Sequence, residues 1–140
     1  MSTAAIAIDS PVRALATGLI RFLETGEAPD ELFANDVFFD VTVPHWRLQA
    51  AGREKAIALR RAQHPAPGRV VRSRLDETPT GFVLEFEERW QESGHSWYAR
   101  EIARADVTDN SIMQLSVYCT GDWDEAREQE HRRTVELLRP

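Results

Sequence analysis

Four strand-like runs follow one another through the second half of the chain, and they constrain its fold more than any other feature. In chain order the runs are Arg69–Thr78, Phe82–Glu92, Ser96–Val107 and Ser111–Cys119. Short segments of turn residues separate them, namely Pro79-Thr80-Gly81, Ser93-Gly94 and Asp109-Asn110. This succession predicts an antiparallel meander.

The residues on either side of the meander predict helices and one further strand. In chain order we expect a helix that begins at Ser10-Pro11 and stops at Gly26, a very short helix over Pro29–Phe33, a strand over Val37–Val43, a helix from Gly52 to about Gln63, and a final helix over Asp122–Leu138. Ser-Pro is typical of a helix start and Gly of a helix end. Asp122 and Glu125 have capping-box spacing.

This order of elements indicates an α+β fold, because the helices come first and the strands are grouped after them. The sheet is expected to be antiparallel and covered on one face. The second and third runs of the meander span about 11–12 residues, against a usual ~5–6, so the sheet must twist and curl around its helices. We expect residues 1–10 to be a flexible tail and residues 11–140 to form one domain.

Charge and cysteine content exclude several classes of function. With 23 Asp and Glu against 17 Lys and Arg, the formal charge of −6 argues against nucleic acid or an anionic membrane as partner. No apolar run approaches the ~18–20 residues that span a bilayer, and Met1–Asp9 lacks the basic start of a secretory signal. The single cysteine forms no internal disulfide, which favours a cytoplasmic location. The histidines lack metal-ligand spacing and no glycine-rich phosphate loop is present, so we expect neither metal nor cofactor.

The middle hairpin divides its side chains between an apolar face and a charged face. A two-residue turn at Ser93-Gly94 pairs Trp90 with Trp97. The face that these tryptophans share is far more apolar than the other and is expected to be the inner one, with Phe82, Leu84, Phe86, Glu88, Trp90, Trp97, Ala99, Glu101, Ala103 and Ala105. The opposite face mixes charges of both signs and suits water or a dimer partner.

The phase of the last strand depends on the turn before it. A three-residue turn at Thr108-Asp109-Asn110 places Met113, Leu115, Val117 and Cys119 inside, whereas a two-residue turn places Gln114, Ser116 and Tyr118 inside. We favour the first phase, because it matches apolar side chains with the apolar face of the hairpin.

Two carboxylates, Glu88 and Glu101, stand on the otherwise apolar inner face. A carboxyl group in a dry pocket has a raised pKa and can act as a general acid or base near neutral pH. Glu101 is the better catalytic candidate, because it lies in the middle of its run among apolar neighbours. The alternative is a structural role, in which an inward arginine pairs with the carboxylate. His45, in Pro44-His45-Trp46, is a third catalytic candidate as a proton shuttle.

Three segments resemble the nuclear transport factor 2-like superfamily, and within it the SnoaL-like and ketosteroid-isomerase-like proteins. They are Leu32-Phe33-Ala34-Asn35-Asp36-Val37-Phe38-Phe39, Gly52-Arg53-Glu54-Lys55-Ala56-Ile57, and Asp109-Asn110-Ser111-Ile112 with Val117-Tyr118-Cys119. The resemblance covers roughly residues 11–120. It implies a conical α+β barrel with an apolar cavity, and often a homodimer formed through the sheet. The superfamily includes isomerases, cyclases and epoxide hydrolases, and also proteins that only bind small molecules.

The chain departs from the catalytic pattern of ketosteroid isomerases. The position that corresponds to their general-base Asp carries Val41, and residues 11–25 contain no Tyr to serve as the oxyanion donor. Their second oxyanion acid falls near Ile102, with Glu101 beside it. Steroid isomerase activity is therefore disfavoured. The resemblance also points Phe39, Val41 and Val43 inward, with His45 in phase at the rim of the cavity.

The ligand-binding candidates are the apolar residues that these phases and the resemblance turn inward. They are Phe39, Val41, Trp46, Phe86, Trp90, Trp97, Leu115, Val117 and Cys119. The tryptophans suit an aromatic wall, although simple core packing explains them equally well. Cys119 has no activating neighbour in the sequence and suits a buried apolar filler better than a nucleophile.

Three functional hypotheses follow from the sequence. The first is a cofactor-independent isomerase, cyclase or hydratase acting on a hydrophobic small molecule, with Glu101 as base and His45 or Glu88 assisting. The second is a non-catalytic protein that binds such a molecule in the same cavity. The third is a homodimerisation module that uses the outer sheet face around Tyr98, Arg100 and Arg104.

Overall fold

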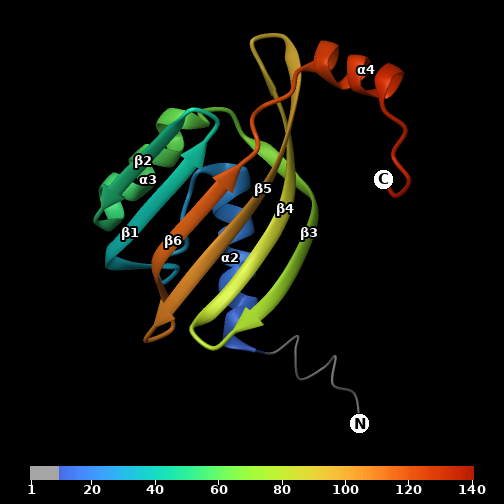
Figure 1. The fold of residues 1–140 in the computed structure, drawn as a ribbon. Helices are drawn as coiled ribbons and strands as arrows, with labels where there is room; N and C mark the ends of the chain where they lie inside the picture. Colours follow the sequence, from blue (N-terminus) through green and yellow to red (C-terminus); the bar gives the residue numbers. More distant parts are fainter. Residues whose placement is uncertain (1–9) are drawn as a thin grey trace.

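A computed structural model describes residues 10–140, and a strongly curved sheet dominates this part of the chain (Figure 1). The strands are β1 (Phe33–Val43), β2 (Trp46–Ala51), β3 (Gly68–Thr78), β4 (Gly81–Glu92), β5 (His95–Thr108) and β6 (Ser111–Cys119). The helices are α2 (Pro11–Thr25), α3 (Arg53–Gln63) and α4 (Glu125–Thr134). In this range, no helix is long and apolar enough to cross a membrane. The flexible tail expected over residues 1–10 falls outside the described residues, apart from Ser10, and stays a prediction.

The strands form one mixed sheet in the order β2-β1-β6-β5-β4-β3. β1 runs parallel to β6, and every other neighbouring pair in this sheet is antiparallel. The sheet curls around α2, which contacts β3 and β4, while α3 packs on β1 and β2 (Figure 1). The predicted α+β class is confirmed. The two edge strands do not pair with each other, so the curled sheet stays open.

Helix α2 begins and ends where the sequence predicts. The Ser10 hydroxyl accepts a hydrogen bond from the backbone N–H of Arg13 at 3.1 Å, and Gly26 ends the helix with a φ of 77°. Its apolar stripe is buried against the sheet. Phe22 meets the rings of Phe33 and Phe39 edge-on, with centroid distances of 5.1 and 6.4 Å. These contacts fix α2 across the concave side of the sheet.

Two predictions near the first strand are wrong. The short helix expected over Pro29–Phe33 is a turn, because the chain passes directly into β1 and the backbone of Leu32 accepts a hydrogen bond from Ile112 at 2.8 Å. Strand β2 is absent from the sequence prediction. It pairs with β1 after a tight turn in which His45 has a φ of 73°, and a bidentate Arg47–Asp40 contact joins the two strands.

The final helix is shorter than predicted. It begins at Glu125, with Asp124 rather than Asp122 as its N-cap, since the Asp124 carboxylate accepts the Arg127 N–H at 2.9 Å. It ends at Thr134 instead of Leu138, because the apolar residues beyond it find no surface on which to pack and stay exposed. Figure 1 shows α4 projecting away from the sheet.

The registers of the meander decide which side chains face inward. The predicted Trp90–Trp97 and Phe86–Glu101 pairs are confirmed. For β6, the predicted three-residue turn is wrong, since Thr108 pairs with Ser111 across a two-residue turn. The register then shifts by one residue at Met113, so that Leu115 faces Ala105. The favoured inward phase of Leu115 and Val117 is thus confirmed, but a bulge rather than the turn produces it.

Candidate functional site

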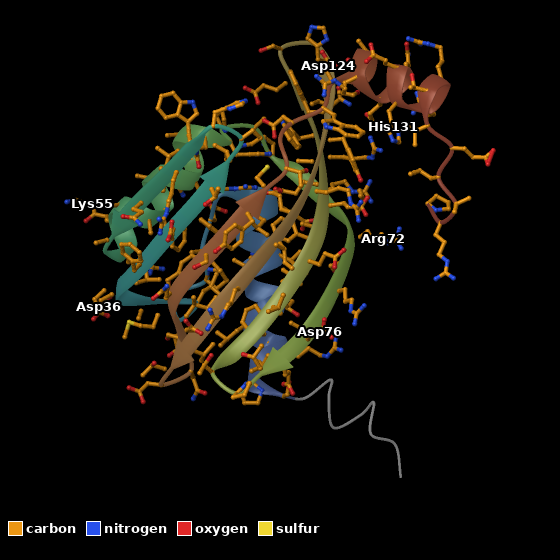
Figure 2. All side chains as sticks on the ribbon, in the orientation of Figure 1. Asp36, Lys55, Arg72, Asp76, Asp124 and His131 are labelled. Carbon is orange, nitrogen blue, oxygen red and sulfur yellow. The ribbon has the colours of Figure 1, made fainter. Side chains whose placement is uncertain are left out.

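A cavity of about 520 Å³ opens between α2, α3 and the strands β1, β5 and β6. Its size falls within the ~300–1,000 Å³ of typical small-molecule sites. Apolar side chains make most of its wall: Phe22, Leu23, Phe39, Val41, Val43, Pro44, Leu115 and Val117. A polar end is lined by Arg60, Gln63, His64, Glu101, Cys119, Gly121 and Asp122. In Figure 2 the labelled charged residues of the surface, such as Asp36, Lys55 and Asp76, lie at the periphery of the fold.

Glu101 is the central ionisable group of the cavity. It projects from β5 and is only 8% exposed. Its Oε2 atom is buried and has no hydrogen-bond partner within residues 10–140. Burial, a hydrogen bond with Glu88 and the negative charge of Glu88 together raise the pKa of Glu101 well above its ordinary value of 4.5. These contacts therefore favour the neutral, protonated form of Glu101.

Glu88 lies beside Glu101 and carries the charge of the pair. It projects from β4, is 1% exposed, and binds the Arg60 guanidinium at 2.6 Å and 3.4 Å through its two oxygens. Burial opposes its ionisation, but the hydrogen bond with Glu101 and the Arg60 charge outweigh it and lower the pKa of Glu88. A proton held by this pair therefore resides on Glu101 in preference to Glu88.

Arg60 positions this pair from α3. Besides Glu88, its Nη2 donates to the backbone carbonyl of Leu23 at 2.7 Å, near the end of α2. The guanidinium therefore ties two helices to the middle of the sheet. Such a buried pair is costly to break, because loss of one partner leaves an uncompensated charge.

His64 is a second ionisable group of the polar end. Its Nδ1 lies 3.1 Å from the carbonyl of Ala66, and its ring packs on Trp90 with a centroid distance of 4.3 Å. Burial and the nearby Arg60 charge lower the pKa of His64, so the imidazole is neutral near pH 7. The Ala66 carbonyl fixes the proton on Nδ1. Nε2, which is buried and has no partner within residues 10–140, then carries a lone pair.

Two further groups complete the polar end. The Asp122 residue is exposed at the mouth, but partial burial of its carboxyl raises the pKa of Asp122. Burial and the neighbouring Glu101 raise the pKa of Cys119 to about 12, so the thiol stays protonated at neutral pH. Its sulfur accepts the Gly121 N–H at 3.4 Å. No cluster of His, Cys, Asp or Glu within residues 10–140 is arranged to hold a metal ion.

Comparisons with known proteins relate this architecture to solved structures. No protein-family model matches the chain, and no curated protein matches its sequence. The structure is similar to an NTF2-like protein from Anabaena variabilis, with a TM-score of 0.69 and 18% identity over 80% of this chain and 88% of the other. The chain has the NTF2-like fold.

Two further solved structures share the NTF2-like fold at low sequence identity. A proposed polyketide cyclase from Xanthomonas campestris has a TM-score of 0.61 and 15% identity over 77% of this chain and 89% of its own. A proposed ketosteroid isomerase from Kribbella flavida has a TM-score of 0.58 and 18% identity over 93% of this chain and 91% of its own. At these identities the likeness establishes the fold.

The structure brings together some of the residues expected to form the site. Glu101, Phe39, Val41, Leu115, Val117 and Cys119 line the cavity of the NTF2-like fold, and Glu88 lies directly behind Glu101. Phe86 is buried in the core without lining the cavity. Trp90 and Trp97 do share a face, with stacked rings 6.5 Å apart, but they do not line this cavity either.

The rim differs from the sequence prediction. Trp46 is 71% exposed on the edge strand β2, and His45 is exposed in the turn before it, so neither reaches the cavity. The placement of Trp46 in an inner aromatic wall is wrong, because β2 lies at the outer edge of the sheet. Conversely, sequence reasoning missed Arg60, His64 and Asp122. Their signals were weak, since Arg60 resembles any solvent-facing arginine of a charged helix.

Proposed function

We propose that the cavity binds a small, largely apolar molecule and that the Glu101–Glu88 pair exchanges a proton with a carbon atom of it. The observation that carries this proposal is a pair of buried, adjacent carboxyl groups at the polar end of an apolar cavity, in which the pKa of Glu101 is raised and that of Glu88 is lowered. The likeness to a proposed polyketide cyclase and a proposed ketosteroid isomerase supports it. Both names imply proton transfers at carbon.

The expected chemistry needs no external reagent. Glu101 donates its proton to one atom of the bound molecule and becomes a carboxylate beside Glu88. Since two adjacent carboxylates repel each other, the pair then removes a proton from another atom of the same molecule. One proton leaves and one returns, which balances an isomerisation or an aldol-type cyclisation. We thus place Glu101 first as an acid, whereas the sequence suggested a base.

A ketone with exchangeable α-hydrogens tests this proposal without knowledge of the natural substrate. We expect the protein to accelerate deuterium incorporation into 2-tetralone in D₂O, followed by NMR. Glu101→Gln should lose this acceleration by at least about 100-fold while 2-tetralone still binds, since general acid–base catalysis contributes ~10²–10⁴-fold. Glu85→Gln, on the exposed face of β4, is the matched control. Equal exchange rates in wild type and Glu101→Gln would refute the proton-transfer role.

A non-catalytic binding protein is the second candidate function. It is favoured by the Arg60–Glu88 pair, which has the geometry of a structural clamp between α3 and β4. Wild-type protein that binds 2-tetralone without exchanging its α-hydrogens would support this alternative. The homodimer through the outer face around Tyr98, Arg100 and Arg104 stays a prediction, which sedimentation of the wild-type chain tests.

A further inference from the structure

The hydrogen-bond donors at the polar end of the cavity are largely engaged by the protein itself. Arg60 is occupied by Glu88 and the Leu23 carbonyl, and the Nδ1–H of His64 by the Ala66 carbonyl. The Gly121 N–H points to the sulfur of Cys119. Gln63, exposed at the mouth, retains an amide that both donates and accepts. A ligand thus meets few free donors there.

The acceptors at the same end are, by contrast, left open. His64 Nε2 and Glu101 Oε2 are buried without a partner, and two of the three such side-chain atoms within residues 10–140 therefore belong to this one cavity. The Asp122 carboxylate at the mouth receives no hydrogen bond from the described residues either. Arg60 is the one cationic side chain of the described lining, and because Glu88 pairs with it, its charge only partly offsets the negative charge that Asp122 and an ionised Glu101 would bring.

We propose that the natural ligand of the cavity is a small apolar amine, bound in its protonated form with the ammonium group on Glu101 and Asp122 and the hydrocarbon part against the apolar wall. This inference rests on the proposed function only for the use of the cavity as a ligand site, and it goes with the binding-protein candidate, because the bound ammonium takes the place of the proton that exchange at carbon would use. An ammonium ion supplies the hydrogen-bond donors that the polar end lacks. A carboxylate ligand would instead face Glu88, Glu101 and Asp122, while Arg60 is already bound by Glu88.

Binding of the ammonium must displace a proton from Glu101. The groups that act on Glu101 electrostatically are Glu88, Arg60, Asp122 and Cys119. Of these, only Arg60 is a cation, and Glu88 already neutralises it. A bound ammonium adds the missing positive charge, so the Glu101 carboxyl ionises and its proton passes to the buffer. The positive charge of the bound ammonium thereby replaces the proton that Glu101 and Glu88 hold when no ligand is bound.

Three isosteric adamantane derivatives test this inference by isothermal titration calorimetry at pH 7. We expect 1-adamantylamine to bind at least about tenfold more tightly than 1-adamantanol, and 1-adamantanecarboxylate to bind most weakly. Titrations in phosphate and in Tris, whose ionisation enthalpies differ, should show release of about one proton per amine bound. Glu101→Gln should abolish the proton release and the amine preference while adamantanol binding persists. Glu85→Gln should behave as wild type.

The outcomes separate this inference from the proposed function. If adamantanol or the carboxylate binds as tightly as the amine, or if the amine binds without proton release, the amine assignment fails while the cavity remains a ligand site. If none of the three compounds binds, the amine assignment and the ligand site fail together. The wild-type measurements decide between these outcomes even if a variant does not fold.

Discussion

Both faces of the β4–β5 hairpin carry glutamates that lie near an arginine, but one face is exposed to water and the other is buried. On the outer face, Arg100 lies 3.7 Å from Glu85 and 3.8 Å from Glu87, and both Arg100 and Glu85 are exposed. On the inner face, Glu88 and Glu101 are buried, and a single guanidinium serves both. Water screens the outer pairs, so they contribute little. Inside, burial acts to raise both pKa values, but Arg60 and the hydrogen bond with Glu101 lower the pKa of Glu88, so the pKa of Glu101 alone is raised. Strand alternation thus decides which carboxyl groups of the hairpin face water and which face the cavity.

Removal of the inner cation should produce the largest effect. Arg60→Met leaves Glu88 buried without its partner, and we expect a loss of about 3–5 kcal/mol in the free energy of unfolding, measured with urea. Arg100→Met is the matched change on the outer face and should cost no more than about 1 kcal/mol. A similar cost for both variants would contradict the contrast between the two faces.

The pH dependence of stability should reveal the proton on Glu101. Because the pKa of Glu101 is higher in the folded state than its ordinary value of 4.5, the folded chain binds more protons than the unfolded chain above that pH. The contribution of the Glu101 carboxyl to the free energy of unfolding is therefore fully present below about pH 4.5. It is lost as the pH rises through the pKa of Glu101 in the folded state. Glu101→Gln should remove this loss and be more stable than wild type at alkaline pH by about 1–3 kcal/mol.

The reference for this comparison is again Glu85→Gln on the outer face. Its urea midpoint should follow that of wild type across the same pH range. The opposite sign for Glu101→Gln, with the variant losing stability relative to wild type as pH rises, would show that Glu101 is ionised in the folded protein.

Thiol labelling compares the two faces at neighbouring positions of β6. Since burial and Glu101 raise the pKa of Cys119 to about 12, its reaction with iodoacetamide at pH 8 should be slow. We expect Tyr118→Cys, introduced in a Cys119→Ser background, to react at least about tenfold faster, because Tyr118 is exposed on the opposite face. Comparable labelling rates at the two positions would show that the cavity does not suppress the thiolate.

The smallest effect is expected at the exposed edge strand. Trp46→Ser should change the free energy of unfolding by no more than about 0.5 kcal/mol and leave 2-tetralone binding intact, because Trp46 is exposed and does not line the cavity. Ligand binding measured by calorimetry decides this point. A clear loss of affinity for 2-tetralone would show that Trp46 contributes to ligand binding, as the sequence suggested.

Local signals predicted most of the fold. Ser10-Pro11 and Gly26 bound α2, and the Ser93-Gly94 turn fixed the hairpin register that turns Glu88 and Glu101 inward. β2 escaped prediction because, although Trp46–Ala50 alternates between apolar and polar residues, the segment has only six residues and contains no β-branched side chain. It forms through pairing with β1, which is a tertiary effect.

The site was only half predictable for a related reason. Strand phase places the two carboxyl groups, but Arg60 and His64 reach them only through the packing of α3 on the sheet. No spacing along the chain encodes that docking. Similarly, phase correctly placed Trp90 beside Trp97, yet the cavity ends before them, and His64 stacks on Trp90 instead.

The unpaired Met113 has a consequence that reaches the far end of its strand. If the pairing continued regularly from the turn, with Met113 opposite Asp106, Gln114, Ser116 and Tyr118 would replace the aliphatic residues on the inner side. The hollow would then be lined by an amide and two hydroxyl groups. The β-bulge at Met113 thereby decides whether β6 presents apolar or polar side chains to the cavity, with no substitution of any lining residue.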